Sequence, residues 1–168
     1  DGLDHSMRVL HYAEIMGKQI GLDESSMKKL RWGSKLHDVG KLSVPKDILE
    51  KPGELTGEER EVIEKHPIEG YNLMPNQIPL ETRHIILMHH AFKWENPYPG
   101  SDGVDRFMDE TISAIRDNGR IMMLAEIVSL ADFYDALVED RPYRRAYPKE
   151  TAREIIKQQF RGKTGYLD

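Results

Sequence analysis

The chain has 168 residues, of which 39% are hydrophobic, a size typical of one domain with its own core. It contains no cysteine, which excludes disulfides, thiolate nucleophiles and cysteine-ligated metal sites and favours a cytoplasmic location. Charged residues make up 32% with a net charge of −5, a balance that disfavours binding to DNA or RNA polymers. The longest apolar stretch, 121–130, is far shorter than the ~20 residues that span a bilayer, so we expect no membrane contact.

Helical spacing dominates the pattern of apolar residues, and the alternation typical of strands is rare. In chain order, the predicted helices cover 3–20, 23–37, 56 to about 71–74, 80–91, 106–117, 120–138 and 148–160. Thr56-Gly57-Glu58-Glu59 is a capping box, and Pro67 should bend or split the helix that follows it. Prolines and glycines in 92–103 predict a loop. The pattern therefore predicts an all-α domain of six or seven helices.

Asp132 lies in the most apolar predicted helix, where nearly every face is hydrophobic. A buried, unpaired carboxylate costs several kcal/mol, so Asp132 must be neutralised, paired or bound to a metal. A salt bridge or a helix-end hydrogen bond would satisfy it as well as a metal would.

Two pairs of adjacent polar residues, His37-Asp38 and His89-His90, end predicted helices. Successive helical side chains point ~100° apart, so His37 and Asp38 can reach one ion only where the helix loosens, as Gly40 allows. Taken alone, His37-Asp38 fits a solvated surface, and two buried imidazoles would each need a polar partner.

The joint pattern favours metal binding over these separate explanations. Five histidines and two aspartates lie on five helical segments, mostly at helix ends next to glycine or proline. Imidazole and carboxylate without sulfur suit Fe, Mn or Zn. Seven ligands exceed what one ion needs, whereas two or three ions bridged by Asp38 would use them.

At this point the chain resembles a known family, the HD superfamily of metal-dependent phosphohydrolases, and within it the HD-GYP class of cyclic-dinucleotide phosphodiesterases. The resemblance spans nearly the whole chain and depends on the order and spacing of several motifs. These are His5-Ser6-Met7-Arg8-Val9, LHDVGK at 36–41, PKDILEKPGEL at 45–55, EKHPIEG at 64–70, His89-His90, DFYDAL at 132–137 and DRPYR at 140–144. The resemblance implies an HD-domain helical bundle with a central metal site over residues 1–168, expected to be a fragment of a longer protein.

The family's metal ligands fall on seven residues of this chain. They are His5, His37, Asp38, His66, His89, His90 and Asp132. The resemblance implies two or three divalent ions, Fe or Mn first, with Zn, Ni or Mg as alternatives. Asp1 stands where some members carry a further acidic ligand, and it is either bound or solvated. We interpret His11 and His84, which match no motif, as structural.

The resemblance also implies substrate and catalytic residues. Lys41 would stabilise the phosphate or the leaving oxygen. Asp38, which would bridge the metal ions, is the second expected catalytic residue. Tyr98, Arg141 and Arg144 would contact the substrate. The alternatives are that Lys41 is an ordinary cation at a helix C-terminus and that Arg141 and Arg144 belong to a solvated turn.

Three nearby residues have two interpretations each. Asp135 either orients a ligand histidine or pairs with an arginine. Phe92 and Trp94 either stack on a guanine or pack within their own loop.

Two departures from the family pattern bear on the substrate. The expected Gly-Tyr-Pro is Pro97-Tyr98-Pro99 here, and Pro97 restricts the backbone path of the loop. The segment from Arg106 to Asp117, predicted to be a polar helix, makes the stretch between Pro99 and Asp132 longer than the family pattern. This insertion is a lid, a partner surface or without function.

The expected activity is hydrolysis of cyclic di-GMP to linear pGpG, with or without a second step to GMP, through a hydroxide that bridges the metals. The alternatives are another cyclic dinucleotide or nucleotide as substrate, or a non-catalytic module that binds a nucleotide and signals. A homodimer or a sensor domain outside this chain is the expected protein partner.

Overall fold

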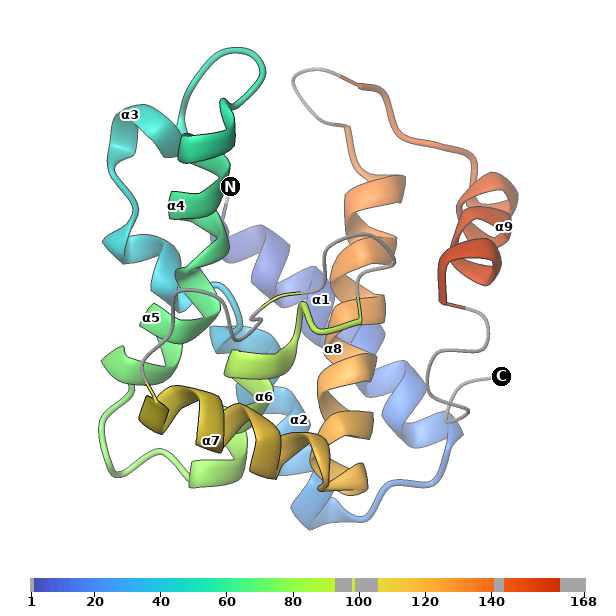
Figure 1. Ribbon diagram of the computed structural model, residues 1–168. Helices are drawn as coiled ribbons and strands as arrows, with labels where there is room; N and C mark the ends of the chain where they lie inside the picture. Colours follow the sequence, from blue (N-terminus) through green and yellow to red (C-terminus); the bar gives the residue numbers. More distant parts are fainter. Residues whose placement is uncertain (1, 93–97, 99–105, 141–143, 161–168) are drawn as a thin grey trace.

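The computed structural model describes the backbone of residues 2–92, 98, 106–140 and 144–160 (Figure 1). Within these ranges the chain is all-α, as predicted, and contains no β-strand element. The helices are α1 (Gly2–Gln19), α2 (Glu24–Leu36), the 3₁₀ helix η1 (Val39–Ser43), α3 (Lys46–Leu49), α4 (Gly57–Glu64), α5 (His66–Leu73), α6 (Leu80–Met88), α7 (Arg106–Arg116), α8 (Gly119–Val138) and α9 (Lys149–Phe160). The short elements η1 and α3, which were not predicted, raise the helix number above the expected six or seven.

Local capping sets several helix boundaries, as the sequence indicates. The Asp23 side chain accepts a hydrogen bond from the backbone amide of Ser26 at 2.8 Å and begins α2. Thr56 and Glu59 form the predicted capping box at the start of α4. Gly21, which follows α1, adopts a φ of 75°, a conformation that glycine takes without strain. These ends are therefore fixed by residues within the same short segments.

Pro67 splits the predicted helix 56–74 into α4 and α5, because it has no amide hydrogen for the ladder and clashes with the preceding turn. Pro67 instead occupies the first turn of α5, where its missing donor costs nothing. The break leaves His66 at the junction of the two helices.

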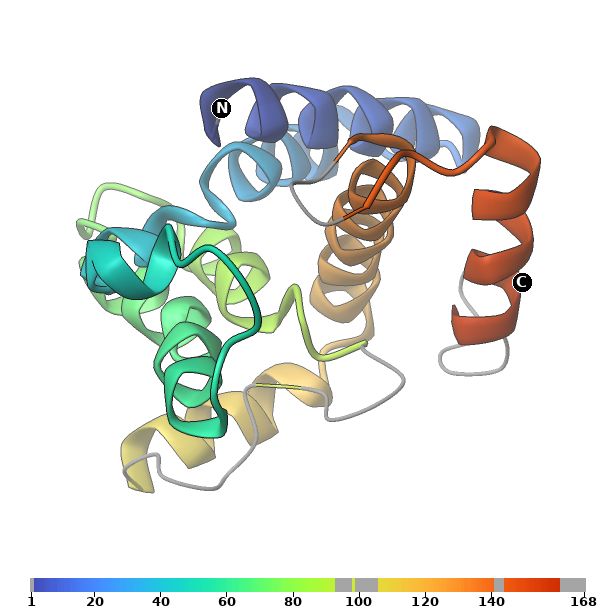
Figure 2. The same cartoon turned by 90° about the horizontal axis from the view of Figure 1, so that it is seen from above.

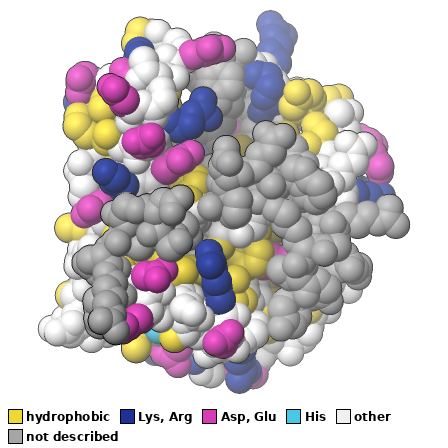
Figure 3. All heavy atoms as spheres, in the orientation of Figure 1, with side chains coloured by type: hydrophobic (Ala, Val, Ile, Leu, Met, Phe, Trp, Pro, Cys, Tyr) yellow, Lys and Arg dark blue, Asp and Glu magenta, His cyan; other side chains and the backbone are white. Residues whose placement is uncertain are grey.

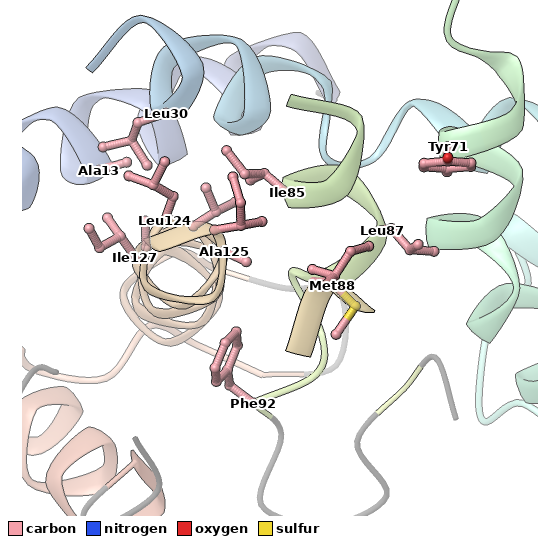
Figure 4. Packing of buried hydrophobic residues seen from close by; sticks show 14 of the residues in the cluster. Ala13, Leu30, Tyr71, Ile85, Leu87, Met88, Phe92, Leu124, Ala125 and Ile127 are labelled. Atoms are coloured by element: carbon pink, nitrogen blue, oxygen red, sulfur yellow. The ribbon is translucent and has the colours of Figure 1, made fainter. Parts of the chain in front are cut away.

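The core is built around α8. Helices α1, α2, α6, α7 and α9 all contact it, and α1 and α7 lie on opposite sides of it in Figure 2. The close-up shows Leu30, Ile85 and Leu124 meeting between α2, α6 and α8 (Figure 4). All three are fully buried. This packing explains why α8 is apolar on nearly every face.

The 3₁₀ helix η1 lies directly against α5. A Cβ atom added to Gly40 would sit 1.8 Å from the carbonyl oxygen of His66 and 2.5 Å from the amide nitrogen of Gly70. The α-helix ends at Leu36, before Asp38, as expected, and Gly40 is in addition required by the close approach of two backbones. The contact brings Asp38, just before η1, next to His66.

The segment 106–117 is an amphipathic helix rather than a merely polar one. Met108, Ile112 and Ile115 of α7 are buried in the main core. Over the face in Figure 3, charged side chains of both signs are interspersed. None of the helices in the described part of the chain has the length and hydrophobicity required to cross a bilayer.

Candidate metal centre

The seven predicted ligands converge at one place in the fold, although they come from segments far apart in sequence. His5 lies on α1, His37 caps the end of α2, Asp38 precedes η1, His66 begins α5, His89 and His90 follow α6, and Asp132 lies on α8. Ligand atoms form two groups, each spanning no more than 4.8 Å. The four-residue cluster contains Asp38, His66, His89 and His90, and the three-residue cluster contains His5, His37 and Asp132.

Asp38 lies between the two clusters. Its Oδ1 is 3.3 Å from Nε2 of His66 in the four-residue cluster. Its Oδ2 is 3.5 Å from Nε2 of His37 and 3.7 Å from Nε2 of His5 in the three-residue cluster. Each carboxylate oxygen thus faces a different cluster, which is the geometry that a bridging ligand needs.

Three of the histidines are oriented by the same kind of local hydrogen bond, from the ring to a backbone carbonyl. Nδ1 of His37, His66 and His89 lies 2.8, 2.8 and 2.6 Å from the backbone carbonyl three residues earlier. A carbonyl only accepts, so Nδ1 is the protonated nitrogen in each ring. These carbonyls belong to the last turns of α2, α4 and α6, where helices leave acceptors without an internal partner. Placing a histidine just after a helix therefore turns its Nε2 lone pair toward the centre.

Two imidazoles of the four-residue cluster, those of His66 and His89, are held in the neutral form. Burial lowers the pKa of His66 to about 4, and the charged Lys41 opposes its protonation further. Burial, together with His37 and His66, lowers the pKa of His89 well below its ordinary value. Neutral imidazole is the form that binds metals.

His5 behaves in the opposite way because it contacts two carboxylates. Its Nε2 lies 3.2 Å from Asp132 and its Nδ1 lies 2.7 Å from Asp135. These hydrogen bonds to Asp132 and Asp135 raise the pKa of His5 to about 9 against the effect of burial. A cation that binds Nε2 must therefore displace a proton from His5.

The two acids at the centre are charged. Burial by itself would raise the pKa of Asp38, but the positive charge of Lys41, 2.6 Å from Oδ2, outweighs it and the pKa falls far below the usual range. For Asp132, burial is likewise outweighed by the hydrogen bond from His5, and its pKa is about 2.

The donor set fits divalent cations for two reasons. Nε2 of His37 is buried and has no hydrogen-bond partner among the described residues. Nε2 of His66 and Nε2 of His89 face each other at 3.3 Å, and in the neutral rings both carry lone pairs because both protons are on Nδ1. Two lone pairs at this distance repel, and a cation that both nitrogens coordinate would remove the repulsion. Imidazoles with carboxylates suit Fe, Mn or Zn.

The predicted substrate residues lie in different surroundings. Lys41 donates to Oδ2 of Asp38 at 2.6 Å. Tyr98 is buried, and its ring centre is 4.6 Å from that of His90. Burial raises the pKa of its hydroxyl, and the nearby carboxylate of Glu64 adds to this. Tyr98 therefore stays a neutral hydrogen-bonding group beside the four-residue cluster.

Arg144 lies at the C-terminal end of α8. Its guanidinium donates to the carbonyls of Ala136, Leu137 and Arg145, and it stacks over Tyr147 with its central carbon 4.4 Å from the ring centre. The contacts with Ala136 and Leu137 satisfy carbonyls in the last turn of α8, a role that was not predicted from the sequence.

Several other predictions fall outside the described residues or the centre. Asp1, Trp94, Pro97 and Arg141 lie outside the described residues, so their predicted roles stay predictions. His84 stacks on Tyr71 with ring centres 6.0 Å apart and belongs to neither cluster.

Sequence reasoning missed Arg8, although a signal was present. Arg8 follows His5 by three residues on α1, and Asp135 follows Asp132 by three residues on α8. This spacing places both members of each pair on one helix face. Asp135 contacts both His5 and Arg8, so the two interpretations of Asp135 hold together.

Comparisons with known proteins identify the family. A family profile described as HD domain matches residues 2–165. The chain belongs to the HD domain family, and its relatives place it in the HD-GYP class of that superfamily.

Several curated proteins are similar in sequence. The cyclic di-GMP phosphodiesterase response regulator RpfG of Xanthomonas campestris pv. campestris (strain 8004) is 34% identical to this chain, over a region that covers 86% of this chain and 35% of the length of RpfG. A cyclic di-GMP phosphodiesterase of Thermotoga maritima is 31% identical over 90% of this chain and 38% of its own. The 3'3'-cGAMP-specific phosphodiesterase 3 of Vibrio cholerae is 31% identical over 92% of this chain and 31% of its own. The chain thus spans about a third of the length of these relatives.

A solved structure supports the fold. The crystal structure of the HD domain of the L. monocytogenes phosphodiesterase PgpH matches with a TM-score of 0.62 and 19% sequence identity. The match covers 94% of this chain and 76% of that one. At this identity the likeness concerns the all-α HD fold alone.

Proposed function

We propose that this domain is a metal-dependent phosphodiesterase that hydrolyses cyclic dinucleotides, with cyclic di-GMP as the preferred substrate and linear pGpG as the product. The observation that carries the proposal is the pair of adjacent clusters with Asp38 between them, one carboxylate oxygen facing each. Two ions held so close together suit the in-line displacement at a phosphodiester. Named phosphodiesterases of cyclic di-GMP and cGAMP among the relatives support the substrate class.

The residues would divide the work as follows. His66, His89 and His90 would hold one divalent ion and His5, His37 and Asp132 the other, with Asp38 shared. When bound, the ions supply an activated water and neutralise the phosphoryl oxygens. Water adds to phosphorus, the bond from phosphorus to the 3′ oxygen breaks, and that oxygen takes up a proton. The product is linear with a 5′ phosphate.

Lys41 and Tyr98 would act on the substrate directly. The Lys41 ammonium, 2.6 Å from Oδ2 of Asp38, is close enough to the centre to stabilise charge that develops on a phosphoryl or leaving oxygen. The neutral hydroxyl of Tyr98 would position a phosphate or sugar oxygen at the four-residue cluster. Arg141 and Arg144 complete the proposed substrate contacts, and Arg144 would have to exchange its carbonyl contacts for a phosphate.

The test is an anaerobic turnover assay with purified protein loaded with Fe or Mn, its metal content measured and its products separated by chromatography. We expect cyclic di-GMP to become pGpG. Lys41→Met should keep its metal and lower kcat by about 10²–10³-fold, as for loss of a group that stabilises transition-state charge. The matched control Lys46→Met removes an exposed lysine whose ion pair with Glu50, at 3.7 Å, lies on the surface, and it should leave kcat unchanged. A folded, metal-loaded protein without turnover would refute the enzyme and favour a module that binds nucleotide without hydrolysis.

The second candidate substrate is 3'3'-cGAMP, because relatives of similar identity are named for it. A panel of both dinucleotides at equal concentration separates the candidates by their kcat/KM ratio. A ratio that favours cGAMP would overturn the preference for cyclic di-GMP but not the reaction class.

A further inference from the structure

Arg8 and Asp135 form a bidentate ion pair behind the metal centre. Nε of Arg8 donates to Oδ1 of Asp135 at 2.6 Å, and its Nη2 donates to Oδ2 at 3.0 Å. The Asp135 side chain is fully buried, whereas that of Arg8 is 34% exposed. A two-point contact of this kind fixes the plane of the carboxylate as well as its position.

The fixed carboxylate in turn contacts a predicted metal ligand. Oδ2 of Asp135, the oxygen held by Nη2 of Arg8, accepts the Nδ1 hydrogen of His5 at 2.7 Å. Since Nδ1 is committed to Asp135, Nε2 is the nitrogen directed toward Asp132 and Asp38, at 3.2 and 3.7 Å. His5 has no helix-end carbonyl to orient it, because it lies within α1 and not just after a helix.

The contact also joins two helices that are remote in sequence. Arg8 and His5 lie on α1, and Asp135 and Asp132 lie on α8, at a sequence separation of 130 between His5 and Asp135. The ion pair therefore sets how α1 lies against α8 at the level of the three-residue cluster. Among the described interactions, the ligands of the four-residue cluster make no contact with Arg8 or Asp135.

We propose that Arg8 is a positioning residue of the metal centre, acting through Asp135 to hold the His5 ring with Nε2 toward the ion of the three-residue cluster. The inference rests on the proposed metal centre. It predicts a selective defect. Loss of Arg8 lowers the affinity for the ion at His5, His37 and Asp132 and leaves the affinity for the ion at the four-residue cluster unchanged.

The experiment compares Arg8→Gln with Arg31→Gln in the purified protein. Arg31 is a matched control because it is also 34% exposed and also joins α1 to a neighbouring helix, through Glu14 at 2.6 Å. Mn²⁺ per chain is measured after equilibrium dialysis, and affinities are measured by chelator competition. His5→Ala and His89→Ala identify which ion each binding step reports, and thermal unfolding without metal reports the fold.

We expect Arg8→Gln to lower the affinity for one ion by about 10–100-fold, as for loss of a group that supports a ligand. The affected ion should be the one that His5→Ala also loses. Arg8→Lys should recover part of the loss, because a lysine keeps the charge but not the two-point contact. Arg31→Gln should bind both ions with wild-type affinity.

Three results would overturn the inference. Arg8→Gln could bind both ions as tightly as the wild type. Arg8→Gln could also lower the affinity for both ions equally and unfold at a lower temperature than Arg31→Gln in the absence of metal. That result would make Arg8 only a structural residue. A wild-type protein that binds no Mn²⁺, Fe²⁺ or Zn²⁺ would instead refute the proposed centre itself, and the inference with it.

Discussion

Replacing Gly40 by alanine should separate η1 from α5 and damage the metal centre although no ligand is replaced. The added Cβ would lie 1.8 Å from the His66 carbonyl oxygen and 2.5 Å from the Gly70 amide nitrogen, both backbone atoms. Contacts shorter than 3.0 Å are essentially never seen for a Cβ, so the two segments must move apart by more than 1 Å. No rotamer change can relieve the clash.

The expected cost follows from this movement. Overpacking of a core costs roughly 1–3 kcal/mol, and a clash between two backbones should reach the upper end or exceed it. Asp38 and His66 flank the contact and face each other at 3.3 Å, so metal affinity should fall with stability. A misplacement of about 1 Å can cost ~10²-fold in rate.

Two other glycines serve as controls. At Gly57, in the first turn of α4, an added Cβ meets nothing within 4 Å, so Gly57→Ala should be neutral or stabilise by up to about 1 kcal/mol. At Gly33 the Cβ would meet side-chain atoms of Ile85 at 2.6 Å, which can adjust, so Gly33→Ala should be intermediate. Urea unfolding and metal content measure the series. If Gly40→Ala unfolds at the same urea concentration as Gly57→Ala and keeps its metal, the close approach of η1 and α5 is wrong.

Three further predictions concern the centre and its surroundings. His89→Ala should lose one ion and keep the helical fold, as measured by metal content and circular dichroism, and full retained activity would contradict its assignment as a ligand. Without metal, the free energy of unfolding should fall as the pH drops from 6.5 toward 4, because His66 is held neutral with a pKa of about 4. The loss from that residue alone is on the order of 3 kcal/mol. The raised pKa of His5, about 9, acts with the opposite sign, and its contribution to stability is lost as the pH rises from 6.5 through 9. Urea unfolding of the metal-free protein across this range tests both signs, and a flat profile below pH 6.5 would contradict the burial of neutral imidazoles. Arg144→Ala should lower the free energy of unfolding by about 1–3 kcal/mol through lost contacts at the end of α8, and a raised KM without that loss would show that its role is on the substrate alone.

The sequence by itself determined the elements whose causes are local. Asp23, Thr56 and Pro67 fix helix ends through contacts within a few residues, and the structure places these ends where the sequence predicts them. The structure also brings together the seven candidate ligands that the family resemblance implied, whereas the burial of each residue alone was equally compatible with a salt bridge or a hydrogen bond.

Only the tertiary structure decided the features that depend on distance between remote segments. Gly40 was expected only to loosen a helix, and the structure shows that it also permits the contact of η1 with α5. The segment 106–117 was expected to be polar, whereas Ile112 and Ile115 enter the core. The pairing of Arg8 with Asp135 joins α1 to α8. Hydrogen bonds within a turn are set by neighbours in the chain, but the face that a helix buries and the residue that meets a charge depend on how the helices pack.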